Sequence, residues 1–377
     1  MKLEKRIYLV GSTHGSYRSR ALLEYLAASP KYCYFHKDPR FLVSKNRTFF
    51  CRLLFEVLRT FDQILSLPAL VISDVVYILP MSNLRFFERI VIRIFKKKVI
   101  GEFYISVYDT LVNDRKTVKK GSIKALKLLK SDQRFIDICE HVVFLNASER
   151  EYYLAIAERP KAIAKTTLIP LATSLKDKVN SSFANKQRDK VILCWWGTFI
   201  PLHGLDKIIE SAVYLKKSGL NFSLYLFGTS EDLSKVYREK IEQLDLSDYV
   251  SIDNTKNFSD KSLDTFLIEN CDIAFGNFGD SEKAKTVMIN KIVEAASMTL
   301  PVVSQQTKAL TEYFKDNESI YFCESHPQKI AERVLDITKG KQQMLIVAQG
   351  SFDLYVKHFS KKSYLHEIVK ILDKVIK

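Results

Sequence analysis

Short apolar runs alternate with amphipathic segments over the first half of the chain. Arg6–Val10 is a β-rich run, a glycine-containing turn follows at residues 11–16, and Arg18–Ala28 has the periodicity of an amphipathic helix. Further strands are predicted at Lys31–His36, Ala69–Ile72, Lys98–Phe103 and His141–Leu145, with helical segments between them. Strands that alternate with helices predict a parallel, doubly wound sheet.

The periodicity stops between Ile169 and Lys190 and then resumes. This segment contains Pro170 and a polar run over Asn180–Asp189, which is typical of a linker between domains. The series that follows predicts a second Rossmann-like unit. Its strands are expected at Val191–Trp195, Phe222–Phe227, Tyr249–Ile252, Asp272–Phe275 and Pro301–Ser304, and its helices at Leu205–Lys217, before about Leu244, and at Asn290–Met298.

These patterns predict an α/β protein with two Rossmann-like domains, at residues 1–172 and 173–350. Phe352–Ile376 is helical and basic and has no strand of its own. We therefore expect residues 351–377 to form a C-terminal helix that crosses back to pack on the first domain.

Ser82–Lys98 is predicted as a basic amphipathic helix. Arg85, Arg89 and Arg93, with Lys96 or Lys97, recur at helical spacing on one face, and bulky apolar residues lie on another. Such a helix can lie in an anionic membrane interface. The alternative is a surface helix packed on its own sheet, and the pattern slightly favours it because every helix of an α/β fold needs an apolar stripe.

Charge is distributed unevenly along the chain. The net charge is +15, and residues 1–172 hold 30 Lys/Arg against 16 Asp/Glu, so nearly all of the excess lies in the first half. A basic domain predicts a polyanionic partner, such as anionic lipid, a phosphorylated substrate or nucleic acid, although a solubilising lysine-rich surface has the same composition.

Cysteine, histidine and hydropathy patterns narrow the class of protein. The six cysteines form no C-x-x-C pair and are interpreted as small core residues in a reducing compartment. The seven histidines do not cluster, so no metal site is predicted. The first apolar run is too short for a signal peptide, and Leu67–Pro80 is too short to span a bilayer. We expect a cytoplasmic protein that is soluble or peripheral.

Two loops at strand ends are candidate ligand sites. Gly11, His14, Gly15 and Arg18 follow the first strand, although the pattern is not G-x-G-x-x-G. In the second half, Gly197, Thr198, His203 and Gly204 join a strand to a helix, where Gly197 allows close backbone approach and the helix N-terminus at Gly204 favours anions.

A second glycine loop follows Asp272–Phe275 and leads to charged helices. It carries Gly279 and Asp280, and then Lys283, Lys285, Asn290, Lys291 and Glu294. Lys291 and Glu294 are three residues apart and share a helix face. Lysines and amides suit a diphosphate, and a carboxylate accepts hydrogen bonds from ribose hydroxyls. A solvated salt bridge is the alternative for this pair.

The order of these motifs resembles the donor-binding half of glycosyltransferase family four, whose members are retaining enzymes of the GT-B fold. The similarity rests on Gly197–Gly204, Asp272–Gly279, Val287–Ala296 and Pro301–Ser304. It extends over about Val191–Val334, and G-T-F-x-P-L-H-G resembles members that assemble bacterial surface polysaccharides. In the first half, the resemblance is looser and covers residues 106–112 and 114–115.

The resemblance implies roles for single residues. Glu294 stands at the second glutamate of the family's E-x7-E motif and should hold the donor ribose, whereas Thr286 replaces the first glutamate. Thr198 and His203 stand where many members carry arginine and lysine for the diphosphate, so Lys283, Lys285 or Lys291 is inferred to replace them. Asp109 is a candidate for orienting the acceptor or the transferred sugar, and the alternative is an aspartate that caps a turn. His203 is a catalytic candidate, and the alternative is a residue that packs locally at the start of a helix.

The implied fold is GT-B, with two Rossmann-like domains facing a cleft. The implied reaction is transfer of a sugar, with retention, from a nucleotide-diphosphate sugar to a hydroxyl of a saccharide acceptor. No metal or other cofactor is expected, because lysines and helix amides would stabilise the leaving diphosphate. Asp109, His203 and Lys291 are the catalytic candidates, and Gly11, His14, Gly15 and Arg18 belong to the acceptor side.

The basic first domain favours a polyprenyl-linked acceptor at the inner membrane face, with the protein peripheral on that anionic surface. Three alternatives stay open. An epimerase of the same fold would bind the same donor, a basic nucleic-acid-binding protein would use the first half, and the missing first glutamate is compatible with a non-catalytic scaffold. Nucleic acid is not the expected partner, because no recognised binding motif is present.

Overall fold

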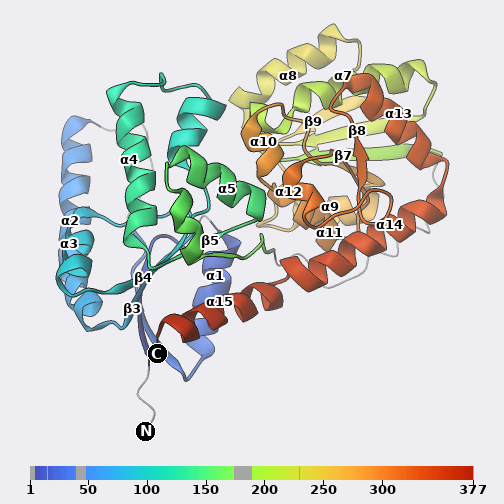
Figure 1. The fold of residues 1–377 in the computed structure, drawn as a ribbon. Coiled ribbons are helices and arrows are strands. Elements are labelled where there is room, and N and C mark those ends of the chain that lie inside the picture. Colours follow the sequence, from blue (N-terminus) through green and yellow to red (C-terminus); the bar gives the residue numbers. More distant parts are fainter. Residues whose placement is uncertain (1–4, 15, 40–47, 174–188, 229, 377) are drawn as a thin grey trace. The chain divides into compact units, whose positions relative to one another are not determined.

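The computed structural model describes residues 5–14, 16–39, 48–173, 189–228 and 230–376. The predicted polar run Asn180–Asp189 lies almost entirely outside these residues. The described chain divides into two compact units (Figure 1). Unit 1 comprises residues up to Leu145 together with Arg150–Pro170 and Tyr364–Lys377, and unit 2 comprises Asn146–Glu149 and Leu171–Ser363.

Unit 1 contains a parallel sheet with helices around it. Within the described residues its strands are ordered β2-β1-β3-β4-β5-β6, and every pairing is parallel. The elements are β1 (Lys5–Val10), α1 (Tyr17–Ala28), β2 (Tyr32–His36), α2 (Phe49–Ile72), β3 (Val75–Ile78), α3 (Phe86–Ile94), β4 (Lys98–Glu102), α4 (Ile123–Ile138), β5 (His141–Phe144), α5 (Ala147–Ile156) and β6 (Thr166–Leu168), with a π-helical turn at Asp109–Asp114 and a 3-10 helix at Pro160–Lys165.

Unit 2 repeats this architecture with the strand order β12-β11-β10-β7-β8-β9, again all parallel among described residues. Its elements are β7 (Val191–Trp196), α7 (Leu205–Lys217), β8 (Phe222–Phe227), α8 (Glu231–Gln243), β9 (Val250–Asp253), α9 (Ser262–Asn270), β10 (Ile273–Phe275), α10 (Glu282–Thr286), α11 (Asn290–Ser297), β11 (Val302–Gln305), α12 (Lys308–Thr311), β12 (Tyr321–Cys323), α13 (Pro327–Thr338) and α14 (Lys341–Leu354), and α15 (Lys361–Val375) closes the chain. A 3-10 helix, Pro201–His203, precedes α7.

In both units the core forms around strands whose side chains are apolar on both faces of the sheet. Residues Val75–Ile78 of β3 are all buried, as expected for a central parallel strand covered by helices on both sides. In unit 2 the core combines strand residues such as Leu193 and Leu224 with Ile208 and Ile209 of α7. The expected fold class, two Rossmann-like α/β units, is therefore confirmed.

One predicted strand was wrong, and the predicted C-terminal helix is interrupted although its last part belongs to unit 1 as expected. Ala69–Ile72 is not a strand but the last turn of α2, and the strand begins at Val75. The apolar run is divided by Ser73, whose hydroxyl donates to the Leu70 carbonyl at 2.7 Å and ends the helix. The expected C-terminal helix over 351–377 is instead the end of α14, a π-helical turn at Tyr355–Phe359, and α15.

The last helix contributes to the core of unit 1. Within that unit, Tyr364 of α15 donates a hydrogen bond to Glu102 of β4 at 3.1 Å. Lys98 donates to the Val375 carbonyl at 2.8 Å, which ties the end of α15 to the start of β4. The cysteines depart in part from the core prediction, because Cys33 and Cys51 are exposed while Cys139, Cys194 and Cys271 are buried.

Candidate functional site

The sheet of unit 2 changes direction beside β7. The chain proceeds from β7 to β8 and β9 on one side, and β10 and β11 lie on the other side. Open parallel sheets bind ligands at the carboxyl ends of strands at such a switch point. Gly197 directly follows β7, and residues 276–280 directly follow β10, so both predicted donor loops lie at this edge.

The two loops touch through their backbones at Gly204 and Gly279. Phe278 donates its N–H to the His203 carbonyl at 3.1 Å. A Cβ on Gly204 would lie 2.4 Å from the Phe278 carbonyl, and one on Gly279 would lie 2.1 Å from the Leu202 oxygen. Gly204 also has a φ of +61°, which disfavours other residues. These glycines are therefore required for loop packing, whether or not a ligand also approaches them.

Lys291 is the most unusual residue at this edge. It lies in the first turn of α11 and is 4% exposed. Its ammonium lies 3.8 Å from the centre of the Trp195 ring and has no hydrogen-bond partner among the described residues. A Cβ built on Gly197 would be 3.5 Å from the Lys291 Nζ, an ordinary contact distance, so the ammonium lies beside that backbone.

Burial holds the pKa of Lys291 well below its ordinary value, and the nearby Glu294 carboxylate offsets part of this effect. A buried cation without a partner costs several kcal/mol, roughly, so such groups are normally paired. An anionic ligand would provide the missing partner and would restore the charged form.

Glu294 lies one turn further along α11 and is held by a tryptophan. The Trp196 Nε1–H donates to the Glu294 carboxylate at 2.6 Å. Burial raises the pKa of Glu294, while this hydrogen bond and Lys291 oppose the rise. Trp195 and Trp196 thus each contact one charged residue of α11, which fixes both side chains at the carboxyl end of β7.

His203 occupies the end of the 3-10 helix that precedes α7. Its ring packs edge-on against Trp195 with centroids 5.9 Å apart, and its Nδ1 has no hydrogen-bond partner among the described residues. Burial and then the positive charge of Lys291 hold its pKa far below the ordinary value, so the imidazole is neutral near pH 7. A neutral ring at this place can accept or donate a hydrogen bond but supplies no charge.

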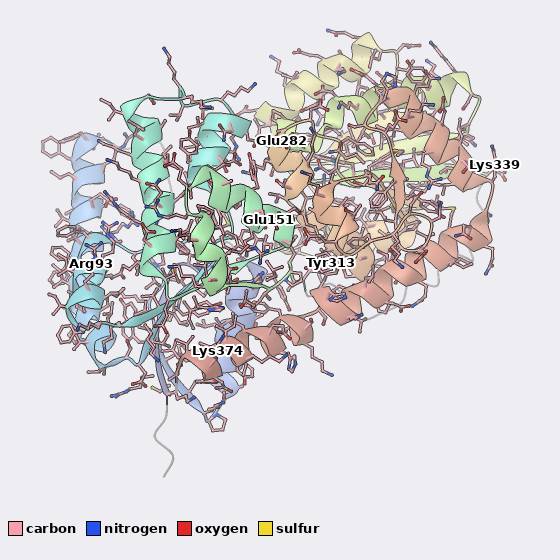
Figure 2. All side chains as sticks on the ribbon, in the orientation of Figure 1. Arg93, Glu151, Glu282, Tyr313, Lys339 and Lys374 are labelled. Carbon is pink, nitrogen blue, oxygen red and sulfur yellow. The ribbon has the colours of Figure 1, made fainter. Side chains whose placement is uncertain are left out.

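The remaining predicted donor residues differ in exposure and in the partners that they contact. Asp280 is exposed and pairs with Lys207 of α7 at 2.5 Å. Lys285 is exposed on α10 and pairs at 3.0 Å with Glu282, which is labelled in Figure 2. Lys283 is buried on the same short helix. Thr198 and Asn290 are exposed, the first after Gly197 and the second at the start of α11.

Unit 1 has its own switch point, between β1 and β3, and a cavity of about 360 Å³ lies there. Gly11 lines it, and a Cβ on Gly11 would lie 2.0 Å from the Ser82 hydroxyl, so only glycine allows the two loops to meet. Asp38 also lines it, accepting from the Thr13 N–H at 2.9 Å, and exposed His14 lies 3.9 Å from Asp38. Gly15 lies outside the described residues.

Arg18 does not reach this cavity, which corrects its assignment to the acceptor side. It is 1% exposed and forms an ion pair with Glu102 at 2.6 Å. It also donates to the carbonyls of Ile169 and Pro170 at 2.8 and 3.0 Å. The helix α1 turns this side chain into the core of unit 1, so its role is structural.

Asp109 is likewise fully buried in unit 1, which argues against the expected contact with acceptor or sugar. Its carboxylate accepts from the Tyr152 hydroxyl at 2.7 Å and from the Asn113 amide at 2.9 Å. Its backbone N–H donates to the Ser106 hydroxyl at 3.0 Å, as at the start of a helical turn. The carboxylate thus accepts from two side chains, and it is Ser106 that accepts the backbone N–H, so these contacts do not match the capping role that the sequence left open.

Sequence reasoning missed the two tryptophans as site residues, although both precede Gly197 in the motif it used. The available signal was two large aromatic residues at the carboxyl end of a buried strand, where ligands of such sheets lie. It also missed Asp38 and the residues of α2 that line the cavity in unit 1. Among the described residues, no group of three or more His, Cys, Asp or Glu side chains is placed to hold a metal ion.

The chain is similar to known proteins in sequence over part of its length and in fold over nearly all of it. Residues 177–351, which cover most of unit 2 and less than half of the chain, match the family described as Glycosyl transferases group 1. A search of curated protein sequences finds no match. The second half of the chain is thus similar to the glycosyl transferases group 1 family.

Solved structures share the fold of the whole chain. Sucrose-phosphate synthase from Thermosynechococcus elongatus superposes with a TM-score of 0.71 at 12% identity, covering 99% of each chain. HepE from Anabaena, solved with UDP and glucose, has a TM-score of 0.66 at 13% identity, covering 98% of this chain and 99% of its own. A glycosyltransferase from Rickettsia africae has a TM-score of 0.62 at 12% identity, with full coverage of both. The chain therefore has the fold of GT-B glycosyltransferases.

Proposed function

We propose that this protein is a retaining glycosyltransferase that moves a sugar from a nucleotide-diphosphate sugar to a hydroxyl of a saccharide acceptor. One observation carries the proposal: the buried Lys291 ammonium has no hydrogen-bond partner among the described residues and lies at the switch point of unit 2, beside Gly197. A diphosphate is the ligand that would satisfy such a cation. HepE, which shares the fold, was solved with UDP and with UDP-glucose.

Each neighbour of Lys291 has a role in the proposed site. Gly197 lets the phosphates approach the backbone, and the amides at the start of α7 face the same edge of the sheet. Glu294, oriented by Trp196, would accept hydrogen bonds from the ribose hydroxyls. Neutral His203 would hydrogen-bond the donor without adding charge.

The chemistry required of the protein is mainly electrostatic. As the bond from the sugar to the diphosphate breaks, negative charge develops on the leaving group, and a cation already fixed in a site shielded from water stabilises that charge strongly. Lys291 is fixed in this way by Trp195. We therefore propose transfer without a divalent metal, and retention of configuration as the family resemblance implies.

The acceptor side of the proposal rests on unit 1. The cavity beside Gly11 has the volume of a small-ligand site and is lined by charged and hydroxyl side chains that suit a saccharide. The excess positive charge of the first half favours an acceptor that is lipid-linked and anionic, as in cell-surface polysaccharide synthesis, with the protein peripheral on an anionic membrane. No helix in the described portion of the chain is both long and apolar enough to cross a bilayer.

The first experiment is a thermal-shift screen against UDP, GDP, ADP, CMP and their sugars, with and without EDTA. A ligand that binds only the folded state raises the unfolding midpoint by mass action. We expect a selective shift with one nucleoside diphosphate that survives EDTA. In the E294A variant this shift should be lost, because the ribose contact is removed.

Two outcomes would contradict the proposal. No shift with any nucleotide would favour a non-catalytic scaffold, for which Thr286 at the position of the first family glutamate is the motivating observation. A nucleotide-sugar that is converted to its epimer without an acceptor would favour an epimerase. Product analysis by NMR separates epimerisation from transfer, and the anomeric coupling of the transferred sugar tests retention.

A further inference from the structure

We propose that α2 and α3 of unit 1 form a surface that docks on an anionic membrane, with their apolar side chains in the headgroup region and the basic side chains of α3 against lipid phosphates. The proposed docking is argued from observations on unit 1 alone. Only its purpose, access to a lipid-linked acceptor, rests on the proposed function.

The first observation is that α2 buries polar residues and exposes apolar ones, which is the reverse of the usual arrangement for a helix of a soluble protein. Its buried residues are Gln63, Ser66 and Leu70, two of which are polar. The Ser66 hydroxyl forms a hydrogen bond of 2.8 Å with Tyr8 of β1, which satisfies this polar side within unit 1. An amphipathic helix on a sheet normally presents its apolar stripe to the core, so this orientation requires another explanation.

The opposite face of α2 is apolar and open to solvent. Leu53, Leu54, Val57, Phe61, Ile64 and Leu65 lie at helical spacing on one face, and their exposed fractions are between 45% and 60%. Single exposed apolar residues are ordinary, but a continuous apolar face marks an interaction surface.

The adjacent helix α3 also exposes apolar side chains and supplies charge. α3 packs against α2, and the outer side chains of both helices can be followed in Figure 2, where Arg93 is labelled. Phe86, Ile94 and Phe95 are 61%, 68% and 50% exposed. Arg93 and Lys96 are exposed beside them and have no ion-pair partner among the described residues. Apolar side chains flanked by free cations are typical of helices that lie in an anionic interface.

This combination of charges favours a membrane over a second copy of the chain. A symmetric dimer through this face would bring Arg89, Arg93 and Lys96 of both copies into one interface, at a cost in desolvation and in repulsion between six positive charges. A bilayer with anionic headgroups satisfies the apolar and the basic side chains together. α2 itself carries Arg52, Glu56, Arg59 and Asp62, which suits a helix that lies at the interface rather than across it.

The cavity of unit 1 adjoins this surface. Arg59 and Asp62 of α2, and Arg85 just before α3, line the cavity, whereas the apolar residues of the same helices face outward. A ligand with a polar head and an apolar tail could therefore place its head in the cavity while its tail stays in the bilayer. That arrangement matches a lipid-linked saccharide.

The test is flotation of the full chain with phosphatidylcholine vesicles that contain phosphatidylglycerol, compared with phosphatidylcholine alone. We expect binding to the anionic vesicles. The triple variant L54S/F61S/L65S should weaken binding by roughly a hundredfold or more, because three apolar anchors are removed. R93Q/K96Q should weaken it by about thirtyfold, at about 1 kcal/mol per cation near the surface, and added salt should weaken it as well.

The matched control is L233S/V236S/I346S, which removes three apolar side chains of unit 2 that are 45%, 64% and 51% exposed. It should bind vesicles like the unaltered chain. Equal binding by control and test variants, or no binding of the unaltered chain to anionic vesicles, would overturn the proposal. So would a dimer in analytical ultracentrifugation that the triple variant of α2 dissociates, because the occupant would then be a second copy.

The nucleotide-induced thermal shift, measured on the same proteins, separates this proposal from the proposed function. The triple variant of α2 should keep the shift, because its changes lie on the outer face of unit 1 and the donor residues lie in unit 2. Loss of vesicle binding with an intact shift supports docking through α2. An intact shift in a chain that never binds vesicles would reject the docking alone.

Discussion

The Lys291 ammonium lies 3.8 Å from the centre of the Trp195 ring, inside unit 2 and without a hydrogen-bond partner among the described residues. A cation over an indole face gains roughly 2 kcal/mol when desolvated, which does not offset the loss of its hydration. Burial holds the pKa of Lys291 well below its ordinary value, so the charged form is costly in the folded protein until an anionic ligand binds. Such a conflict between packing and function is typical of binding sites.

The variant K291M should separate binding from stability. Methionine has a similar length and no charge, so the free energy of unfolding without ligand should rise by about 1 kcal/mol. Affinity for the nucleoside diphosphate should fall by roughly thirty- to a hundredfold, because a charge-assisted contact is lost. Urea denaturation and titration calorimetry measure the two quantities. K285M is the matched control, since Lys285 is exposed and pairs with Glu282, and it should change neither by much. A K291M protein that binds the nucleotide normally would remove Lys291 from the site.

The variant G204A should disrupt the contact between the two donor loops. The new Cβ would lie 2.4 Å from the Phe278 carbonyl, in a backbone with φ of +61°. We expect a loss of about 3 kcal/mol or more in the free energy of unfolding, from the clash together with left-handed strain. G219A is the control, because Gly219 also has a positive φ of +76° but open space around it, and it should cost about 1 kcal/mol. Equal losses measured by urea denaturation would contradict the proposed loop contact.

The variant R18M should destabilise unit 1 by leaving Glu102 buried without its cation. We expect a loss of about 3 to 5 kcal/mol in the free energy of unfolding. The double variant R18M/E102Q should recover part of it, because the unpaired charge is removed. R20M changes the exposed neighbour on α1 and should be nearly neutral. If R18M instead left stability intact and weakened acceptor binding, Arg18 would belong to the acceptor side after all.

Asp132 makes stability depend on pH in an unusual direction. Burial raises its pKa to about 6 from 3.8, despite a hydrogen bond of 2.6 Å from the Ser106 hydroxyl. Because the folded state holds this proton more tightly than the unfolded state, the contribution of Asp132 is fully present below about pH 4 and is lost as pH rises through about 6. Relative to the unaltered chain, D132N should therefore gain up to about 3 kcal/mol between pH 4 and pH 7.

Urea denaturation at several pH values measures this difference, and D137N is a control of opposite sign. The exposed Asp137 has its pKa lowered by hydrogen bonds from Arg159, so its small contribution is present above its unfolded pKa and is lost as the pH falls. A flat difference between D132N and the unaltered chain would mean that Asp132 is ionised in the folded protein at pH 4 and above.

The sequence alone determined the alternation of strands and helices and the position of the two glycine loops at strand ends of unit 2. Buried parallel strands read as apolar runs, and α7 and β8 have the predicted bounds Leu205–Lys217 and Phe222–Phe227. The position of Lys291 and Glu294 on one face of α11 was also predictable, because residues three apart on a helix share a face whatever surrounds them. These features depend on local backbone geometry and periodicity, which a single sequence contains.

Other features were decided only by the tertiary structure. Arg18 has the composition of a surface residue, and only the approach of β4, with Glu102, makes it a buried ion pair. Trp195 and Lys291 are far apart in sequence, so their contact depends on how β7 and α11 pack. The periodicity of α2 shows an apolar face but not its direction, because the same stripe can meet a core or a membrane. In the folded protein the polar face of α2 packs on unit 1, where Ser66 forms a hydrogen bond with Tyr8 of the sheet, and the apolar face therefore lies outside.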